Sequence, residues 1–443
     1  MSASVFDSPL YAQLFPTGDA GRLFSDTAAI RAMLLVEGAL AKAQGAQGII
    51  PELSARAIQR ATMEIQIDPG AIARDTGENG VSVPGLVAAF RAEMNAPEHA
   101  QFVHWGATSQ DIIDTALMLR LRQLLLLTEA DLRTVISNLA VQAETHAETP
   151  MVARTYGQHA VPTSWGAVLA DWGHGLCDLL DALPALRTTS LYVSLSGAAG
   201  TASALGADAA ATREALAAGL GLGDPKRSWH TDRGPILRIA DWLVQITALL
   251  SRMGATLIQL TGNDIAEIRL GAAGASSTMP QKQNPVAPSV LHALGHQAMG
   301  LRAALGPATQ HLNQRDGASW FAEWMVLPQI GLGTASGLQH AKTLTAGMKP
   351  DAAQMAANLE KQSGAIYAEA LSFALAEKMQ RPLAQAEAKA LCREAQVTVG
   401  PLETIARAAH PDLADGLFDP AQSLGLAPQD ARVFVARARE LTS

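Results

Sequence analysis

The stretch from Gly274 to Pro285 reads G-A-S-S-T-M-P-Q-K-Q-N-P. Loops of such small residues expose backbone N–H groups that can hold an anion. Lys282 adds a positive charge and Asn284 a hydrogen-bonding amide, and nearby positive charge favours the alkoxide form of a serine. The alternative is a flexible linker that ends in a helix N-cap. The spacing of Met279, Pro280, Lys282 and Asn284 favours a site for proton transfer beside a carboxylate.

This stretch resembles the signature G-S-S-x-M-P-x-K-x-N of the fumarase/aspartase superfamily, which includes argininosuccinate and adenylosuccinate lyases. One position departs, because Ala275 stands where the family has glycine. The resemblance implies that Ser276, the earlier serine of the pair, is the catalytic base and acid, although Ser277 stays open as the titrating group. It also implies that Lys282, counted with Ser276 as catalytic, and Asn284 hold the substrate carboxylate.

The composition is apolar and poor in charge. Of the 443 residues, 48% are hydrophobic and 17% are charged, whereas about a quarter are charged in typical soluble domains. This balance favours long packed helices whose surfaces are partly covered by other subunits. The net charge of −8 argues against general nucleic-acid binding, which needs basic patches. A local positive cluster can still bind an anionic substrate.

The sequence indicates a soluble, cytoplasmic protein without membrane contacts. Cys177 and Cys392 lie far apart in helix-like sequence, which favours two buried thiols over a disulfide or a zinc site. The N-terminal sequence M-S-A-S-V-F-D-S lacks the basic and apolar regions of a signal peptide. We expect no apolar run as long as the roughly 18 residues of a transmembrane helix.

Helical periodicity dominates, and no convincing strand alternation is found. Apolar residues recur at steps of three and four, a spacing that favours helix bundles. The seams are Trp165, Leu169, Trp172, Leu176, Leu179 and Leu183; Ile239, Leu243, Ile246, Leu250, Met253, Leu257 and Leu260; a weaker set of Val290, Leu294, Gln297, Leu301 and Ala304; and Ile113, Leu117, Leu121 and Leu124 in a helix that begins near Ser109. The second seam continues into Asp264 and Glu267, which predicts either a polar pocket in the bundle or a helix end that reaches solvent.

Proline and glycine residues interrupt the helical patterns and divide the chain into three parts. Residues 1–108 form short helical patterns, residues 109–347 carry the long helices, and residues 348–443 return to shorter ones. The fold predicted is all-α, with an N-terminal helical domain, a central long-helix bundle and a C-terminal helical domain. The superfamily resemblance implies the same architecture.

A first additional motif is H-W-G-A-T-S-Q-D from His104 to Asp111. Thr108 to Asp111 forms a capping box, and a plain helix start would explain it. A capped helix N-terminus is also a ready anion site. The resemblance implies that Thr108 and Ser109 bind a substrate carboxylate and that His104 lines the site.

A second motif is R-T-Y-G-Q-H from Arg154 to His159. The lyases usually read R-T-H-x-Q here, and their histidine serves acid/base chemistry or substrate contact. Tyr156 replaces it in this chain, while Gln158 matches the family's glutamine, which the resemblance implies is a substrate contact. A nitrogen leaving group needs a proton, but a carboxylate, with an ordinary pKa of about 4, does not. The substitution therefore favours lactonisation, unless His159 supplies the acid rather than serving as a structural residue.

A third motif runs from Asn313 to Trp324 as N-Q-R-D-G-A-S-W-F-A-E-W. Its aromatic ending and the aromatic at position 156 resemble the branch of cycloisomerases that lactonise 3-carboxy-cis,cis-muconate. By that resemblance Arg315 is a carboxylate clamp, because its planar fork suits bidentate recognition. A salt bridge at a helix end is the alternative. The segment from Ser228 to Arg233 is similar to the same branch but predicts no chemistry. Ser196 to Thr201 resembles a family turn that lets backbones approach closely.

The resemblance implies an enzyme that adds a carboxylate of a small polycarboxylate substrate to a conjugated double bond, with no metal or organic cofactor. It also implies a homotetramer whose active sites are shared between three subunits. Adenylosuccinate lyase or another superfamily lyase is the alternative reaction. A non-catalytic structural homologue is the alternative of another kind.

Overall fold

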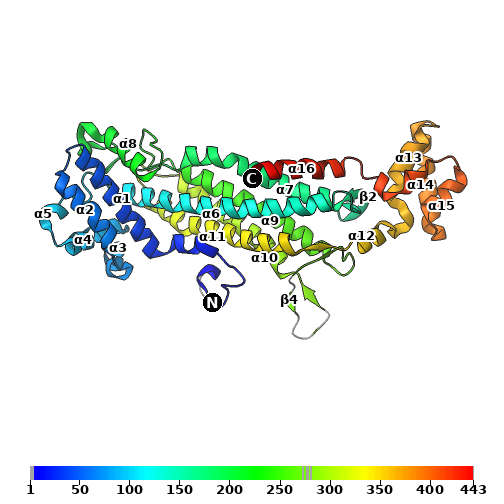
Figure 1. The fold of residues 1–443 in the computed structure, drawn as a ribbon, viewed down its shortest axis with the longest axis horizontal. Helices are drawn as coiled ribbons and strands as arrows, with labels where there is room; N and C mark the ends of the chain where they lie inside the picture. Colours follow the sequence, from blue (N-terminus) through cyan, green and yellow to red (C-terminus); the bar gives the residue numbers. More distant parts are fainter. Residues whose placement is uncertain (1–3, 272–273, 276–278, 280–281, 443) are drawn as a thin grey trace. The chain divides into compact units, whose positions relative to one another are not determined.

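The computed structural model describes residues 4–271, 274–275, 279 and 282–442. In these ranges the chain is mainly helical, which confirms the predicted all-α class (Figure 1). The helices are α1 (Asp26–Ala46), α2 (Glu52–Glu64), α3 (Ala73–Asn79), α4 (Val83–Met94), α5 (Pro97–Ala100), α6 (Ser109–Thr145), α7 (Trp165–Ser190), α8 (Ala209–Leu220), α9 (Gly234–Leu260), α10 (Val286–Leu305), α11 (Gly317–Gly347), α12 (Ala352–Leu359), α13 (Ala368–Ala376), α14 (Arg381–Thr398), α15 (Leu402–Ala409) and α16 (Ala427–Thr442). The strands are β1 (Pro150–Thr155), β2 (Gln158–Ser164), β3 (Ile268–Arg269), β4 (Gly274–Ala275), β5 (Gln283–Asn284) and β6 (Lys349–Pro350).

The chain forms two compact units. The first contains Met1–Asp131, Asp181–Ala248 and Ala293–Gln339, and the second contains Leu132–Leu180, Leu249–His292 and His340–Ser443. Each of the five division points falls inside a helix, so that α6, α7, α9, α10 and α11 each contribute to both units. The boundaries expected after residues 108 and 347 stay a prediction.

The seams predicted from the sequence lie in the long helices. Every member of the first seam in α7 and of the second seam in α9 is buried. The helix expected from Ser109 begins at that residue. The weaker seam in α10 is wrong at its end, because Ala304 is exposed and Leu305 is buried instead.

The acidic continuation of the second seam is not helical. Helix α9 ends at Leu260, so Asp264 and Glu267 lie beyond it. Asp264 is exposed, as the solvent alternative predicts, whereas Glu267 is fully buried. Neither alternative describes Glu267, whose charge is paired inside the second unit.

Helix α9 also departs from the expectation that no apolar run in this chain is as long as a transmembrane helix. By length and composition alone, Gly234–Leu260 is one helix in the described ranges that could cross a membrane, and 56% of its most apolar window is buried inside the protein. Its fully buried members, such as Ile239 and Leu257, belong to the packed seam. A core helix therefore accounts for its apolar character.

The core of the first unit lies among α1, α2, α4, α8 and the start of α6. Leu34, Ile58, Phe90 and Ile112 are almost fully buried there. Helices α1 and α2 pack closely because Gly45 has no side chain, and a Cβ at this position would lie 2.3 Å from Ala55 Cβ. This core supports the loop that leads into α6.

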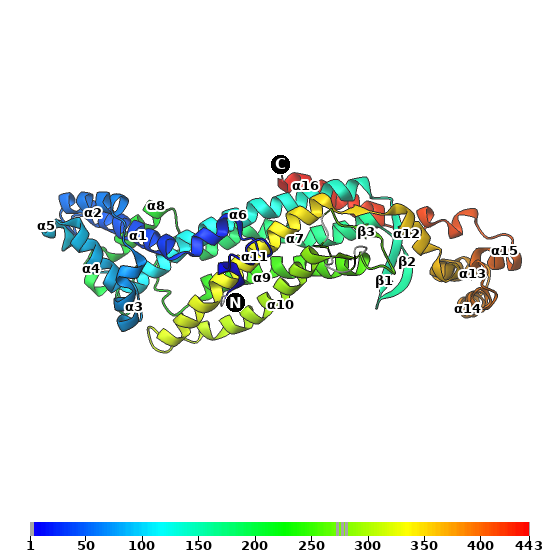
Figure 2. The same cartoon turned by 90° about the horizontal axis from the view of Figure 1, so that it is seen from below.

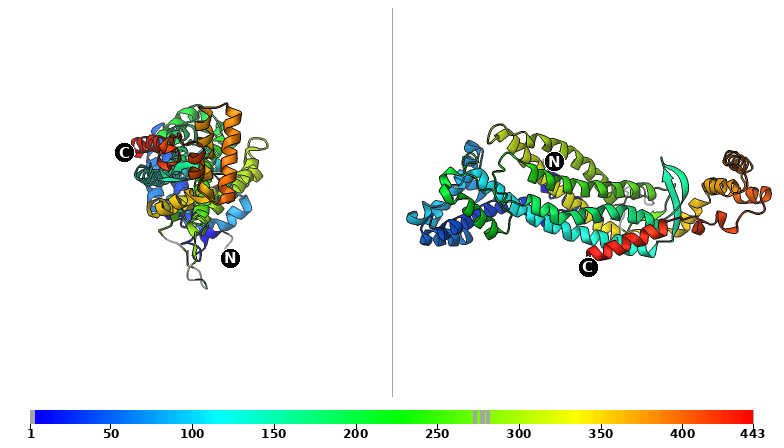
Figure 3. Two further views of the ribbon diagram at one scale, coloured as in Figure 1. Left: turned by 90° about the vertical axis from the view of Figure 1, so that its right-hand side faces the viewer. Right: turned by 90° about the horizontal axis from the view of Figure 1, so that it is seen from above.

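The second unit has a packed bundle region and a separate C-terminal core. Helix α16 lies along the first half of α7 (Figure 3), where Phe434 occupies the space left by Gly173 and stacks edge-on against His174. Arg437 and Asp178 add an ion pair of 2.7 Å. The C-terminal core is built from α13, α14 and α15, with Leu371 and Ala406 at its centre.

A β-hairpin interrupts the helices of the second unit and was not predicted. Strands β1 and β2 pair antiparallel (Figure 2) and join through a two-residue turn at Tyr156 and Gly157. Both turn residues have positive φ, 51° and 73°, as a type I′ hairpin turn requires. The strands escaped prediction because a bulge between Val152 and Arg154 breaks their alternation.

Candidate active site

The N-terminus of α6 is organised by one buried carboxylate. Asp111 accepts hydrogen bonds from the backbone N–H of Thr108 (3.1 Å), Ser196 (2.8 Å) and Gly197 (2.9 Å), and from Ser194 Oγ (3.1 Å). His230 Nε2 lies 2.9 Å from the same group. The capping role is thus real, but Asp111 also joins the Ser196–Gly197 turn to the helix end. Gly197 has a φ of +69°, which permits this close backbone approach.

Arg315 lies at the same helix end. Its Nε donates to Gln110 Oε1 (2.9 Å), and its Nη2 donates to Thr108 Oγ1 (3.3 Å) and to the Ala198 carbonyl (3.2 Å). Its Nη1 has no partner within the described ranges. Arg315, Thr108 and the half-buried Ser109, the first residue of α6, are therefore together in the first unit. A guanidinium beside a helix N-terminus provides two kinds of positive potential for an anion.

His104 is held in place by Glu37 of α1. Its backbone N–H donates to Glu37 Oε2 (3.1 Å), and its Nδ1 lies 2.7 Å from Glu37 Oε1. Burial of the ring opposes protonation, but the hydrogen bond and negative charge of Glu37 outweigh it and raise the pKa of His104. The residue has a φ of +64°, an uncommon conformation for a non-glycine residue. This pairing leaves Nε2 as the ring atom that can meet a ligand.

A charged network behind the helix end was not predicted. Arg233 donates to both oxygens of Asp114 (2.7 and 3.0 Å) and to both oxygens of Glu323 (2.9 and 2.8 Å), and all three side chains are buried. Gln110 Nε2 donates to Asp114 Oδ2 (3.2 Å) and thereby connects the network to Arg315. Burial raises the pKa of Glu323 even though Arg233 opposes the shift.

The network gives a role to the segment from Ser228 to Arg233, for which the sequence predicted no chemistry. Trp229 Nε1 donates to the Val193 carbonyl (2.9 Å), which fixes the segment that carries His230 and Arg233. The signal in the sequence was the D-x-x-D spacing of Asp111 and Asp114 at the start of α6. Two acids on one face of an apolar helix need buried partners.

In the second unit, the hairpin carries the other substrate residues that were predicted. Tyr156 is fully exposed at the turn, and Gln158 beside it is also exposed. His159 pairs with Arg154 across the strands. Burial and the positive charge of Arg154 lower the pKa of His159. Its imidazole is therefore neutral at pH 7 and is a poor source of a proton.

The base of the hairpin is fixed by Glu267. Arg154 donates to its two carboxylate oxygens (2.9 and 2.7 Å), and Asn358 Nδ2 donates to Oε1 (2.8 Å). The backbone N–H of Asp351 binds the Glu267 carbonyl (2.8 Å). A fork-to-fork pair of this kind has strong directional preference. The sequence did not assign Glu267 a partner, since Arg154 lies more than a hundred residues away.

The two ends of the serine loop form a short antiparallel pair. Gly274 pairs with Asn284, and Ala275 pairs with Gln283. A Cβ at Gly274 would lie 2.5 Å from Val286 Cγ2, so glycine is required one residue before the family's usual position. Lys282 is exposed, and its backbone N–H donates to the Met279 carbonyl (3.0 Å). The predicted catalytic Ser276 lies outside the described residues.

The predicted site residues thus fall into two groups. His104, Thr108, Ser109 and Arg315 belong to the first unit, and the first unit brings Thr108 and Arg315 into contact. Of the other predicted site residues that the structure describes, the second unit contains Tyr156, Gln158, His159, Lys282 and Asn284. Each group by itself offers positive charge or hydrogen-bond donors, which suits recognition of a carboxylate.

Comparison with known proteins agrees with these motifs. A model of the lyase family matches residues 20–300. The 3-carboxy-cis,cis-muconate cycloisomerase of Pseudomonas aeruginosa is 36% identical, over 97% of this chain and 95% of that protein. A nitrosuccinate lyase of Streptomyces davaonensis is 34% identical, over 99% and 91%. The crystal structure of 3-carboxy-cis,cis-muconate lactonizing enzyme from Pseudomonas putida superposes with a TM-score of 0.92 at 33% identity, over 98% of this chain and 100% of that one. The chain therefore belongs to this lyase family, within the fumarase/aspartase superfamily.

Proposed function

We propose that this protein is a cycloisomerase that lactonises 3-carboxy-cis,cis-muconate, a step in the breakdown of protocatechuate. Its similarity to cycloisomerases over nearly the whole chain supports the reaction. The observation that carries it is Tyr156, which stands at the hairpin turn where lyases of the superfamily have histidine. His159, three residues along the chain, has a lowered pKa and is neutral at pH 7. A site without a strong acid here fits a carboxylate as the reacting group.

The reaction has two parts. One carboxylate oxygen of the substrate adds to the conjugated double bond and closes the lactone ring. The electron pair of that bond moves toward a remote carboxylate, which becomes an aci-carboxylate. Lys282 and Asn284 stabilise the added negative charge. The hydroxyl of Ser276 then gives its proton to the α carbon and later regains one from solvent.

The first unit supplies the groups that hold the carboxylates that do not react. Arg315 presents its Nη1 from a fixed position, because hydrogen bonds from Nε to Gln110 and from Nη2 to the Ala198 carbonyl already restrain the guanidinium. Thr108 and Ser109 present the capped start of α6. His104 carries positive charge over a wider pH range than an ordinary histidine, since Glu37 raises its pKa. Together they match a tricarboxylate better than a substrate with one acid group.

We also propose that the protein is a homotetramer whose active sites are shared between subunits. The low charge content of the chain, 17% of its residues, supports an assembly with much buried surface. The fully exposed Tyr156 at the tip of a hairpin also supports it, because an aromatic side chain there gains most from contact with another copy. Sedimentation should give a tetramer, and a stable, active monomer would contradict the proposal.

The substrate test is a direct comparison under identical conditions. Purified protein should bleach the ultraviolet absorption of 3-carboxy-cis,cis-muconate, because lactonisation shortens the conjugated system. Adenylosuccinate and argininosuccinate should remain unchanged. Nitrosuccinate is the sharper control, since nitrite, like a carboxylate, leaves without a proton. Efficient cleavage of any of the three succinates, without lactonisation of the muconate, would overturn the proposed reaction.

A subunit-mixing experiment tests the shared site. Ser276→Ala and His104→Ala proteins are each expected to have low activity. If the two residues act in one site but come from different subunits, mixed tetramers contain some sites with neither substitution. Activity should then rise above that of either parent after dissociation and reassembly. Activity equal to the average of the parents would contradict shared sites.

A further inference from the structure

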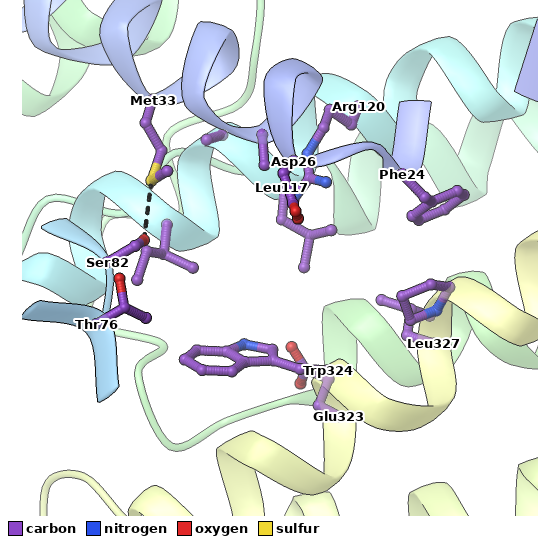
Figure 4. A pocket seen from close by; sticks show the side chains of 14 residues that line it. Phe24, Asp26, Met33, Thr76, Ser82, Leu117, Arg120, Glu323, Trp324 and Leu327 are labelled. Carbon is purple, nitrogen blue, oxygen red and sulfur yellow. Dashed lines mark hydrogen bonds between the residues drawn. The ribbon is translucent and has the colours of Figure 1, made fainter. Parts of the chain in front are cut away.

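The first unit contains a cavity that the proposed reaction does not use. It has a volume of about 300 Å³ and lies among α1, α6 and α11, with Thr76 of α3 and Ser82 at its edge. Figure 4 shows Leu117 and Trp324 facing each other across the space, with Met33 at one end. Most of its lining is apolar, so a bound molecule would lose water against hydrocarbon and aromatic surface.

One charged group in this cavity lacks sufficient partners. Arg120 of α6 makes a single hydrogen bond in the described ranges, from Nη1 to the Leu23 carbonyl (3.3 Å). Its Nε is buried and has no partner among the described residues. Burial lowers the pKa of Arg120 to about 10, although the negative charge of Asp26 opposes the shift. A buried guanidinium in this state is stabilised by an anion that can accept its hydrogen bonds.

The two acids of the cavity do not fill that role. Glu323 also lines the cavity, but both of its oxygens are bound to Arg233. Asp26 is exposed at the start of α1, and no ion pair within 4 Å joins it to Arg120 in the described part of the chain. In Figure 4 the Asp26 carboxylate and the Arg120 guanidinium lie at the same side of the space, away from Thr76 and Ser82.

We propose that this cavity binds a small monocarboxylate with a flat apolar body, such as an aromatic acid. The carboxylate meets Arg120, and the ring lies between Leu117 and Trp324. The hydroxyls of Thr76 and Ser82 stand at the opposite end, where they donate to the Ile72 carbonyl (2.9 Å) and to Met33 Sδ (3.7 Å). Their oxygens can accept a hydrogen bond from one polar substituent. A second carboxylate is disfavoured, because the described lining away from Arg120 is mainly apolar and offers no second basic side chain, and Glu323 is already paired with Arg233.

This ligand class differs from that of the proposed substrate. The proposed active site offers Lys282, Asn284 and Arg315 to several carboxylates, whereas the cavity offers Arg120 to one. Arg120 lies three helical turns beyond Ser109 on α6, so the two sites share a helix but none of these residues. The inference therefore does not depend on the proposed function.

Benzoate is the probe for the test, with benzyl alcohol as its neutral counterpart. Calorimetric titration of the full-length protein should show saturable benzoate binding and much weaker binding of the alcohol. Arg120→Met keeps an apolar stem and removes the charge. It should weaken benzoate binding at least about tenfold, the effect of losing a charge-assisted hydrogen bond. Arg56→Met is the matched control, because Arg56 is exposed and paired with Glu52 (2.5 Å).

Two further variants locate the binding. Lys282→Met should leave benzoate binding intact, and a loss there with retention in Arg120→Met would overturn the proposal. Ala29→Leu narrows the cavity without touching the guanidinium and should also abolish binding, which covers the case in which Arg120→Met fails to fold. Absence of saturable binding to the wild-type protein, or equal affinity in Arg120→Met, would likewise overturn it.

Discussion

The start of α6 and the serine loop both offer groups for an anion, but they are built in opposite ways. At the start of α6 buried neighbours hold the groups in place. Asp111 accepts five hydrogen bonds, and Gln110 restrains Arg315. At the serine loop the two ends are paired through β4 and β5, while Lys282 is exposed to solvent. The arrangement at the start of α6 holds its hydrogen-bonding groups in fixed positions. The serine loop instead offers the exposed positive charge of Lys282.

This difference predicts a division of labour. A restrained guanidinium selects ligands by the positions of their carboxylates, because displacing it disturbs a buried network. An exposed lysine is a mobile point charge. Its attraction to the substrate becomes stronger as negative charge develops there. Substitutions at the serine loop should therefore affect the chemical step most, and substitutions at the α6 end should affect substrate selection.

The largest expected effect is at Ser276. Ser276→Ala should reduce kcat by at least about a thousandfold, the scale of losing a positioned proton-transfer group. Substrate binding should survive, because Lys282 and Asn284 remain. Steady-state kinetics and equilibrium binding of substrate check the two parts separately. Near-normal turnover would remove Ser276 from the mechanism, and a comparable loss in Ser277→Ala alone would move the role by one residue.

The next effect separates Lys282 from Arg315. Lys282→Met should lower kcat and raise KM together, by about a hundredfold in kcat/KM, because the aci-carboxylate carries more charge than the substrate. Arg315→Lys keeps the charge but loses the planar guanidinium that Gln110 and Ala198 hold in place, and should raise KM about tenfold with little change in kcat. Lys349→Met is the control at an exposed lysine. If Lys282→Met and Arg315→Lys changed kcat and KM in the same proportions, the proposed division of labour between the serine loop and the start of α6 would be contradicted.

A smaller effect concerns the pH dependence of stability. The folded pKa of His104 is raised, so its pairing with Glu37 contributes fully below the unfolded pKa of about 6.5 and is lost as pH rises through the folded pKa. Glu37→Gln should cost about 1–3 kcal/mol at low pH, the effect of losing a charged hydrogen bond. Thermal unfolding between pH 5 and about pH 8 should show the gap between variant and wild type closing as pH rises. A gap that widens would contradict the pairing.

The smallest effect is expected at Tyr156. Tyr156→His restores the residue that lyases carry at this position. Because a carboxylate needs no general acid, lactonisation should not become faster and should stay within about twofold of the wild-type rate or fall below it. A clear gain in rate would show that the wild-type enzyme lacks an acid that its reaction needs.

The regular parts of the fold were predictable because they depend on local spacing. The seams of α7 and α9 follow from residues three and four positions apart, and the start of α6 follows from one capping box. The hairpin was missed because its bulge removes the alternation and its turn is Tyr-Gly rather than a common turn pair. The site was predictable where a motif is contiguous, as at Thr108 or Lys282.

Long-range pairing marks the limit of that reasoning. Glu37 with His104 and Arg233 with Asp114 and Glu323 join residues 67, 119 and 90 positions apart. Nothing in the local sequence says which buried acid meets which base, since every arginine can pair with every carboxylate. Only the packing of the helices decides the partners. The residues that hold other residues in position are therefore recognised from the structure. The residues predicted to contact the substrate are recognised from the sequence motifs.

Glu267 ties together segments that are remote in the chain, which has a consequence for the lifetime of the fold. Its carboxylate binds Arg154 and Asn358, at sequence separations of 113 and 91 residues. Closing loops of that length costs chain entropy before the contacts form, so we expect these bonds to form late in folding. Arg154→Met should leave the folding rate nearly unchanged and accelerate unfolding. The buried acid thus sets how long the second unit stays folded rather than how quickly it forms.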